Sequence, residues 1–230
     1  MNRLAIIPAR GGSKRIPKKN ILEFNGKPII AYSIETAIRS NLFNKIMVST
    51  DDKGIAEVAI DLGAEVPFYR SGKNSGDFAT TFDVIEEVLN FYSDEGMSFD
   101  YACCIYPTAP FVTENKLKSA FDKLVQEKLD LVYPVVEYSF PVQRAVRIAN
   151  EKVYMIQPEH LATRSQDLEP TYHDAGQFYF FKVEALMREK KLVTPNTGAM
   201  IVSDLEAQDI DNPSDWELAQ VKYKLFHDKK

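Results

Sequence analysis

The sequence has no long apolar run. Its longest hydrophobic stretches, such as residues 4–7 and 101–105, are far shorter than the roughly 20 residues that cross a bilayer. The chain also begins directly with a strand-like stretch, without the charged region, apolar core and cleavage site of a secretory signal. We therefore expect a cytoplasmic protein with no membrane partner.

Cysteine is scarce, because Cys103 and Cys104 are the only two in 230 residues. Neighbouring side chains of a strand point to opposite faces, so this pair suits neither a disulfide nor a chelating site. Two thiols in a buried strand agree with a reducing compartment.

Positive charge is in short supply as well. The chain has 28 Lys and Arg against 33 Asp and Glu, which gives a formal net charge of −5. An acidic protein binds nucleic acid poorly, so we exclude nucleic acid as a partner. A local cluster of basic residues then indicates a small anionic ligand.

The composition that remains is typical of a folded domain, with 45% hydrophobic and 27% charged residues. Strand and helix patterns alternate along the chain, which predicts the α/β class and a mostly parallel sheet with helices on both faces. Strands are expected at 4–9, 45–50, 65–69, 101–106, 129–136, 177–182 and 199–203. Helices are expected at 28–40, 55–62, 80–92 and 113–127, and a last one begins at Asn212-Pro213. Thr80 and Asp83 resemble a capping box at the start of the 80–92 helix.

The alternation breaks between residues 137 and 172. Two apolar stretches, 146–148 and 153–156, are separated by a polar turn and predict a hairpin. We expect a single domain over residues 1–230, from which 137–172 protrude as a hairpin arm. The apolar side chains of this arm would stay partly wet in a monomer, which favours a homodimer whose arm closes the partner's substrate pocket.

The strongest chemical signal is the loop of residues 8–20, which follows the first strand and holds five basic residues and no acidic one. The five are Arg10, Lys14, Arg15, Lys18 and Lys19. Gly11, Gly12 and Ser13 would let backbone N–H groups approach phosphate oxygens, at the sheet edge where α/β proteins bind ligands. The loop thus predicts a phosphate site. It is neither a P-loop nor a dinucleotide fingerprint, and a solvated basic loop is the alternative.

Two acidic residues near the C-terminus give the second signal. Asp209 and Asp211 lie on the same side of an extended segment, so their carboxylates sit side by side. Such a pair is costly without a cation, and Mg²⁺ held by these carboxylates and by substrate phosphates meets that need. The alternative is that Asp211 or Asn212 only caps the helix that follows.

Three weaker signals lie at the ends of predicted elements. Tyr106 ends a strand and opens a proline-rich turn that reaches 110. Asp51-Asp52 also ends a strand, but here a helix N-cap is the simpler interpretation. Residues 164–167 and 172–177 flank the arm and are rich in side chains suited to a carboxylate and several hydroxyls.

Together these motifs resemble the acylneuraminate cytidylyltransferases, that is, the CMP-sialic acid synthetases and their relatives. The matching segments are 8–20, 24–28, 48–52, 63–66 and 209–211, in the same order as in the family. The resemblance implies a nucleotide-diphospho-sugar transferase-like, Rossmann-like fold and a homodimer. It also implies transfer of CMP from CTP to a nonulosonic acid, with Mg²⁺ and release of pyrophosphate.

The resemblance also implies roles for individual residues. Catalytic roles fall to Lys19, Arg10 and Lys14, and the metal ligands are Asp209 and Asp211. The nucleotide site comprises Arg10, Gly11, Gly12, Ser13, Lys14, Arg15, Lys19, Asn20, Arg70 and Thr81. The sugar site comprises Tyr106, Arg164, Gln166, His173, Asp174 and Gln177.

The sugar-site motifs depart from the sialic acid enzymes. Tyr106 and Val112 stand where those enzymes have Gln and Arg, and residues 173–176 replace an Arg-Pro-Asn-Gly-like run. The run 172–179 is instead similar to the pseudaminic acid cytidylyltransferases, which serve bacterial surface glycans, typically flagellin glycosylation. N-acetylneuraminate, legionaminate and 3-deoxy-manno-octulosonate are the alternative sugars. A non-catalytic nucleotide-binding protein is the alternative of another class, and the intact aspartate pair speaks against it.

Overall fold

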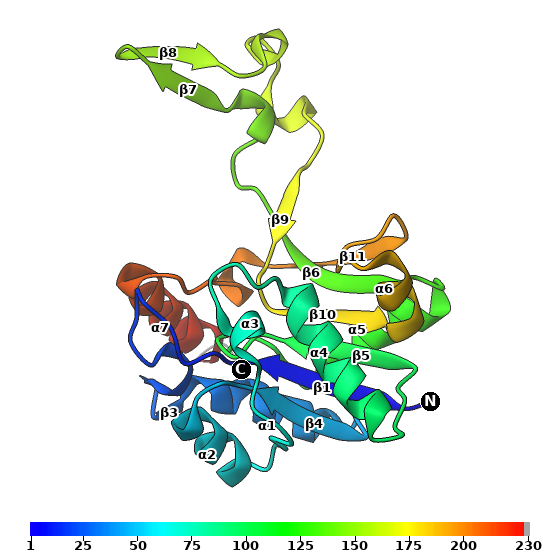
Figure 1. The fold of residues 1–230 in the computed structure, drawn as a ribbon. Coiled ribbons are helices and arrows are strands. Elements are labelled where there is room, and N and C mark those ends of the chain that lie inside the picture. The colour runs from blue at the N-terminus through cyan, green and yellow to red at the C-terminus, as the bar shows by residue number, and fades with distance from the viewer. Residues whose placement is uncertain (228–230) are drawn as a thin grey trace.

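One sheet organises residues 1–227, the part of the chain that this computed structural model describes (Figure 1). Its order is β11-β6-β10-β5-β1-β4, and β9 also pairs with β6. The seven strands are β1 (Arg3–Pro8), β4 (Lys45–Ser49), β5 (Tyr101–Ile105), β6 (Leu131–Glu137), β9 (Tyr172–Asp174), β10 (Phe178–Lys182) and β11 (Thr197–Val202).

Five strands of the sheet share one direction. β1 pairs in parallel with β4 and β5, and β6 pairs in parallel with β11. β10 runs antiparallel to both β5 and β6, so β5 and β6 are parallel to each other. The mostly parallel sheet is therefore confirmed, with β9 and β10 as the reversed strands. They are reversed because the chain re-enters the sheet at the edge where β6 ends, instead of returning through a crossover helix.

Helices cover both faces of the sheet, as predicted (Figure 1). The helices of the described chain are α1 (Ile29–Ser40), α2 (Lys53–Asp61), α3 (Gly72–Ser75), α4 (Thr81–Asp94), α5 (Glu114–Gln126), α6 (Val183–Glu189) and α7 (Pro213–His227). α1, α2 and α5 bury their apolar residues with Ala5 and Ile7 of β1. α4 and α6 do so with Leu4 and Ile6, since side chains of a strand alternate between faces.

Two local predictions have different outcomes. α4 begins with the predicted capping box, in which Thr80 and Asp83 bond each other's backbone N–H. Residues 65–69 form only two isolated bridges to the β4 side, at Glu65 and Tyr69, so the strand predicted there is wrong. Pro67 lies between them and has no N–H to donate to a ladder.

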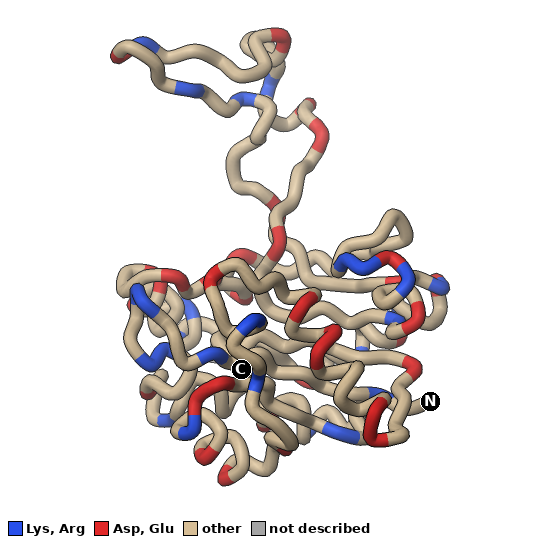
Figure 2. Tube along the Cα trace, viewed as in Figure 1, with Lys and Arg blue, Asp and Glu red and all other residues tan. Residues whose placement is uncertain are grey.

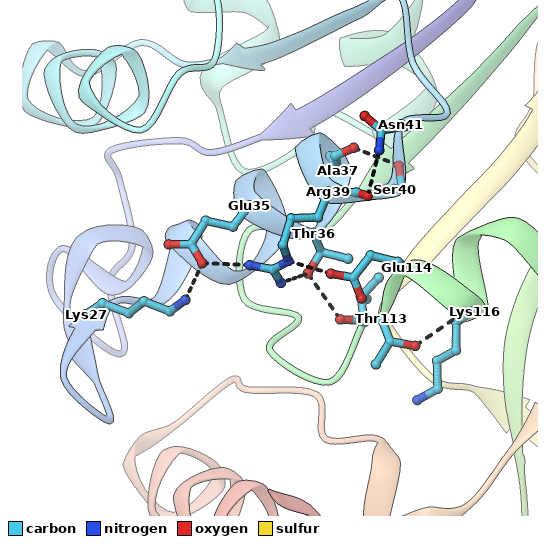
Figure 3. Close-up of polar contacts among 11 residues, drawn as sticks. Lys27, Glu35, Thr36, Ala37, Arg39, Ser40, Asn41, Thr113, Glu114 and Lys116 are labelled. Carbon is cyan, nitrogen blue, oxygen red and sulfur yellow. Dashed lines mark hydrogen bonds and ion pairs between the residues drawn. The ribbon is translucent and has the colours of Figure 1, made fainter.

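A cluster of charged side chains joins α1 to α5 and to the short hairpin of β2 (Glu23–Phe24) and β3 (Lys27–Pro28) (Figure 3). Arg39 Nε contacts Glu114 Oε1 at 2.5 Å, and Arg39 Nη1 contacts Glu35 Oε2 at 3.1 Å. Lys27 Nζ reaches the same Glu35 oxygen at 2.6 Å. These contacts hold the pKa of Glu114 below its ordinary value, since the Arg39 hydrogen bond favours the charged carboxylate.

The segment between β6 and β9 extends away from the sheet (Figure 1). It contains an antiparallel hairpin of β7 (Val146–Ala149) and β8 (Lys152–Met155), and three short 3-10 turns, η2 (Val142–Arg144), η3 (Pro158–His160) and η4 (Ser165–Asp167). Phe140 and Ile148 are 84% and 76% exposed. Among residues 1–227, no helix has the length and apolarity needed to cross a membrane.

Candidate active site

The loops that follow the carboxyl ends of β1 and β5 meet residues 70–84, which include α3 and the start of α4, and the segment before α7. They enclose a cleft of about 650 Å³, a size typical of small-molecule sites. Most predicted nucleotide and metal residues line it. They are Arg10, Ser13, Lys14, Arg15, Lys19, Asn20, Arg70, Thr81, Asp209 and Asp211.

The 8–20 loop packs against Asp51 and Asp52, the two aspartates that follow β4. Gly11 N–H donates to Asp51 Oδ1 at 2.8 Å, and a Cβ on Gly11 would lie 2.8 Å from Asp52 Cβ. Only glycine fits there, and its N–H is already engaged. Gly11 and Gly12 do not line the cleft. Gly11 therefore packs the loop against its support, and the prediction of phosphate contact at this residue is not supported. Asp52 is the N-cap of α2, as expected, and accepts from Ile55 N–H at 2.9 Å.

Acidic partners neutralise the basic loop. Lys14 Nζ and Arg10 Nη1 contact the carboxylate of Asp77 at 2.6 and 3.0 Å, and Arg15 Nη2 contacts Asp211 Oδ1 at 2.8 Å. Figure 2 shows the basic loop beside these acidic segments. Asp77 was not among the predicted site residues, because its local sequence carries no motif. The cleft is thus a mixed-charge site in which carboxylates hold the cations that a phosphate would meet.

Lys19 reaches across the cleft to the segment before α7. Its Nζ donates to the carbonyl oxygen of Ile210 at 2.5 Å and lies 4.0 Å from Asp211 Oδ1. Burial lowers the pKa of Lys19, and the charges of Asp211 and Asp209 oppose that shift. Asn20 supports the loop from inside, with its Nδ2 donating to Arg10 O at 3.0 Å.

Helix capping does not occupy the aspartate pair. Asn212 Oδ1 accepts from Asp215 N–H at 3.1 Å, and Asp215 Oδ2 accepts from Asn212 N–H at 2.9 Å, which caps α7. Burial and the nearby charge of Asp211 raise the pKa of Asp209. A carboxylate repelled by its neighbour gains most from a cation, and oxygen donors of this kind suit Mg²⁺. Asp209 and Asp211 therefore fit the predicted metal.

Arg70 and Thr81 also line the cleft. Arg70 is only 7% exposed, and its guanidinium donates to Ser49 Oγ at 2.9 Å and to the Ser49 carbonyl. Burial lowers the pKa of Arg70. Thr81 Oγ1 lies 3.1 Å from the hydroxyl of Tyr106, so the first turn of α4 is tied to the end of β5.

The predicted sugar residues lie in four different places in the structure. Tyr106 lines the main cleft, while His173 and Asp174 line an adjoining cavity of about 250 Å³ that shares Asp209 with the cleft. Gly176 has φ +62° and packs against Asp209, where an added Cβ would lie 3.6 Å from the Asp209 Cβ. This turn brings the 173–176 run next to the carboxylate of Asp209.

The other predicted sugar residues lie elsewhere. Gln177 is 2% exposed, lines neither cavity, and donates through Nε2 to the carbonyl of Glu206 in η5 (Asp204–Glu206) at 2.5 Å. It therefore joins β10 to η5 instead of facing a ligand. Arg164 and Gln166 lie in the arm, where Arg164 pairs with Asp167 at 2.7 Å. The chain does not bring these two to its own cleft.

Three comparisons with known proteins agree with this site. A cytidylyltransferase family model matches residues 4–213. A pseudaminic acid cytidylyltransferase of Campylobacter jejuni is 41% identical over 99% of both chains. A CMP-N,N'-diacetyllegionaminic acid synthase of Legionella pneumophila is 31% identical over 98% of this chain and 97% of its own.

A solved structure shares the fold. CMP:2-keto-3-deoxy-manno-octonic acid synthetase complexed with CTP superposes with a TM-score of 0.71 at 17% identity, covering 99% of this chain and all of its own. At that identity the likeness concerns the architecture alone. It confirms the predicted nucleotide-diphospho-sugar transferase-like fold.

Proposed function

Since the chain belongs to the cytidylyltransferase family, we propose that it transfers CMP from CTP to the anomeric hydroxyl of pseudaminic acid and releases pyrophosphate. The observation that carries this proposal is the 41% identity to a pseudaminic acid cytidylyltransferase over nearly the whole chain. The cleft agrees with it, because four cations and the Asp209 and Asp211 carboxylates line one space of nucleotide size.

Charge neutralisation is the main task of the basic loop. In phosphoryl transfer the protein mostly positions reactants and stabilises charge. Arg10, Lys14, Arg15 and Lys19 would bind the triphosphate and stabilise the leaving pyrophosphate. Arg70 and Thr81, which also line the cleft, would hold the nucleoside end.

Asp209 and Asp211 would hold Mg²⁺. When bound, the ion supplies Lewis acidity and a template for the phosphates. Asp209 lines both cavities, so it stands between the proposed nucleotide and sugar positions. The two reacting groups would then lie on either side of one carboxylate.

The arm is proposed to complete the sugar site of a second subunit. Arg164 and Gln166 lie far along the arm, while its stem at β9 leaves the sheet beside the 250 Å³ cavity (Figure 1). Exposed apolar residues of the hairpin suit a dimer interface. We expect a dimer in light scattering at micromolar concentration. A fully active monomer would reject this part of the proposal.

We place the reaction in the cytoplasm, and we propose that the product supplies a glycosyltransferase of bacterial surface glycans such as flagellin. The free, fully buried thiols of Cys103 and Cys104 agree with a reducing compartment.

Pyrophosphate release tests the function directly. The protein is incubated with CTP, Mg²⁺ and, in turn, pseudaminic, legionaminic, N-acetylneuraminic and 3-deoxy-manno-octulosonic acid. We expect the highest kcat/KM with pseudaminic acid. Equal values for pseudaminic and N-acetylneuraminic acid would defeat the sugar assignment, and no release with any sugar would leave a nucleotide-binding protein.

A further inference from the structure

Three tyrosines from neighbouring strands form a row on the α4 face of the sheet. Tyr179 of β10 stacks on Tyr133 of β6, with ring centroids 5.6 Å apart, and meets the edge of Tyr106 at 5.5 Å. Tyr179 is 5% exposed and belongs to the core. A buried phenol needs a hydrogen-bond partner, so the direction of its hydroxyl is informative.

The hydroxyl of Tyr179 donates to Asp174 Oδ2. The other oxygen of this carboxylate, Oδ1, accepts from Gly176 N–H at 2.8 Å. Two donors from different elements therefore fix Asp174, although the residue itself is exposed. These two hydrogen bonds restrict the side-chain rotation that an exposed aspartate normally keeps.

Asp174 is fixed where an acceptor sugar would bind. It lines the 250 Å³ cavity together with Asp209. Gly176 contacts both aspartates, because its N–H bonds Asp174 and its Cα packs against Asp209. A carboxylate only accepts hydrogen bonds, so it repels the carboxylate of a sugar acid and attracts its hydroxyl and acylamino N–H groups. Sites that bond a particular donor reject isomers that place the donor elsewhere.

We propose that Tyr179 is a positioning residue for sugar recognition: it holds the Asp174 carboxylate beside Asp209, where Asp174 accepts a hydrogen bond from a hydroxyl or acylamino N–H of the acceptor. The inference rests on the proposed function and names a determinant of its sugar specificity. At one end the tyrosine row reaches Thr81 through Tyr106, and a phenylalanine at 179 keeps the ring that packs against Tyr106.

Tyr179→Phe tests the proposal, with Tyr133→Phe as the matched control. Both variants remove one hydroxyl from the same ring stack, and among residues 1–227 no hydrogen bond joins Tyr133 to Asp174. For Tyr179→Phe we expect the KM for the sugar to rise about tenfold and the KM for CTP to change less than about twofold. The ratio of kcat/KM for pseudaminic acid to kcat/KM for each of the other three sugar acids should fall. Tyr133→Phe should match the wild type.

A double variant separates positioning from stability. If Tyr179 acts through Asp174, adding Tyr179→Phe to Asp174→Asn makes sugar use no worse than Asp174→Asn alone. Additive losses would overturn the proposal, as would an unchanged sugar KM in Tyr179→Phe or an equal effect in Tyr133→Phe. A wild type that releases no pyrophosphate with any sugar would overturn the proposed function and this inference with it. Normal wild-type turnover with an unaffected Tyr179→Phe variant would overturn the inference alone.

Discussion

Lys19→Met should abolish most of the activity without unfolding the protein. The side chain of Lys19 is 19% exposed, and its ammonium lies 4.0 Å from Asp211 Oδ1 and 2.5 Å from the Ile210 carbonyl oxygen. At 4.0 Å two unit charges interact by about 4 kcal/mol with an effective dielectric of about 20. This interaction energy is an upper limit for a phosphate at a similar distance from the ammonium, because burying the ammonium costs free energy and lowers its pKa.

The net contribution of a charge-assisted contact is about 1.5–3 kcal/mol. A tenfold change costs about 1.4 kcal/mol, so kcat/KM for CTP should fall roughly 10- to 150-fold. Pyrophosphate release under steady-state conditions measures it, and circular dichroism shows that the variant is folded. Lys19→Arg keeps the charge and should lose less.

Lys18→Met is the matched control. Lys18 is the preceding residue, yet it is exposed and does not line the cleft. Its variant should turn over CTP normally. A folded Lys19→Met protein within about threefold of the wild type, or a Lys18→Met protein that is equally impaired, would refute the reasoning.

Three further predictions follow from the charges. Asp77→Asn removes the carboxylate that competes with phosphate for Lys14. The KM for CTP in steady-state assays should therefore fall about threefold. A raised KM for CTP would contradict this expectation. Asp211→Asn should lower Mg²⁺-dependent turnover about a hundredfold while calorimetry still detects CTP binding; normal rates would assign the metal elsewhere. The folded-state pKa of Glu114 lies below its ordinary 4.5, so its pairing with Arg39 stabilises the fold above that pH and is lost as pH falls through the folded-state value. Arg39→Met should therefore reduce the acid sensitivity of the urea midpoint, and an unchanged dependence on pH would argue against the pairing.

Local sequence patterns predicted the parts of the molecule that local physics controls. The capping box of Thr80 and Asp83 spans four residues, and its hydrogen bonds form within one turn. The position of the 8–20 loop followed from the buried strand before it, because ligand loops lie at the carboxyl edge of such sheets. The family resemblance added the metal role of Asp209 and Asp211, which capping alone left open.

The features that were missed depend on contacts between distant segments. Asp77 lies 63 residues from Lys14 in the chain, and only the fold brings them together. Gln177 has a polar side chain in a polar motif, yet its burial is decided by η5, which arrives 29 residues later. The antiparallel direction of β10 depends on the point at which the chain re-enters the sheet after the arm. None of these leaves a periodic signal in the sequence.

The adjacent cysteines provide built-in reporters for the opening of each face of the sheet. Cys103 lies in the core formed with α1, α2 and α5, and Cys104 lies in the core formed with α4 and α6, each with 0% exposure. Burial raises the pKa of Cys104 to about 12 and that of Cys103 well above its ordinary value, and only the thiolate attacks an alkylating reagent. Each thiol therefore becomes reactive only when its own side of the sheet opens. Pulsed alkylation followed by mass spectrometry would thus time the separation of the two helix layers from a single central strand.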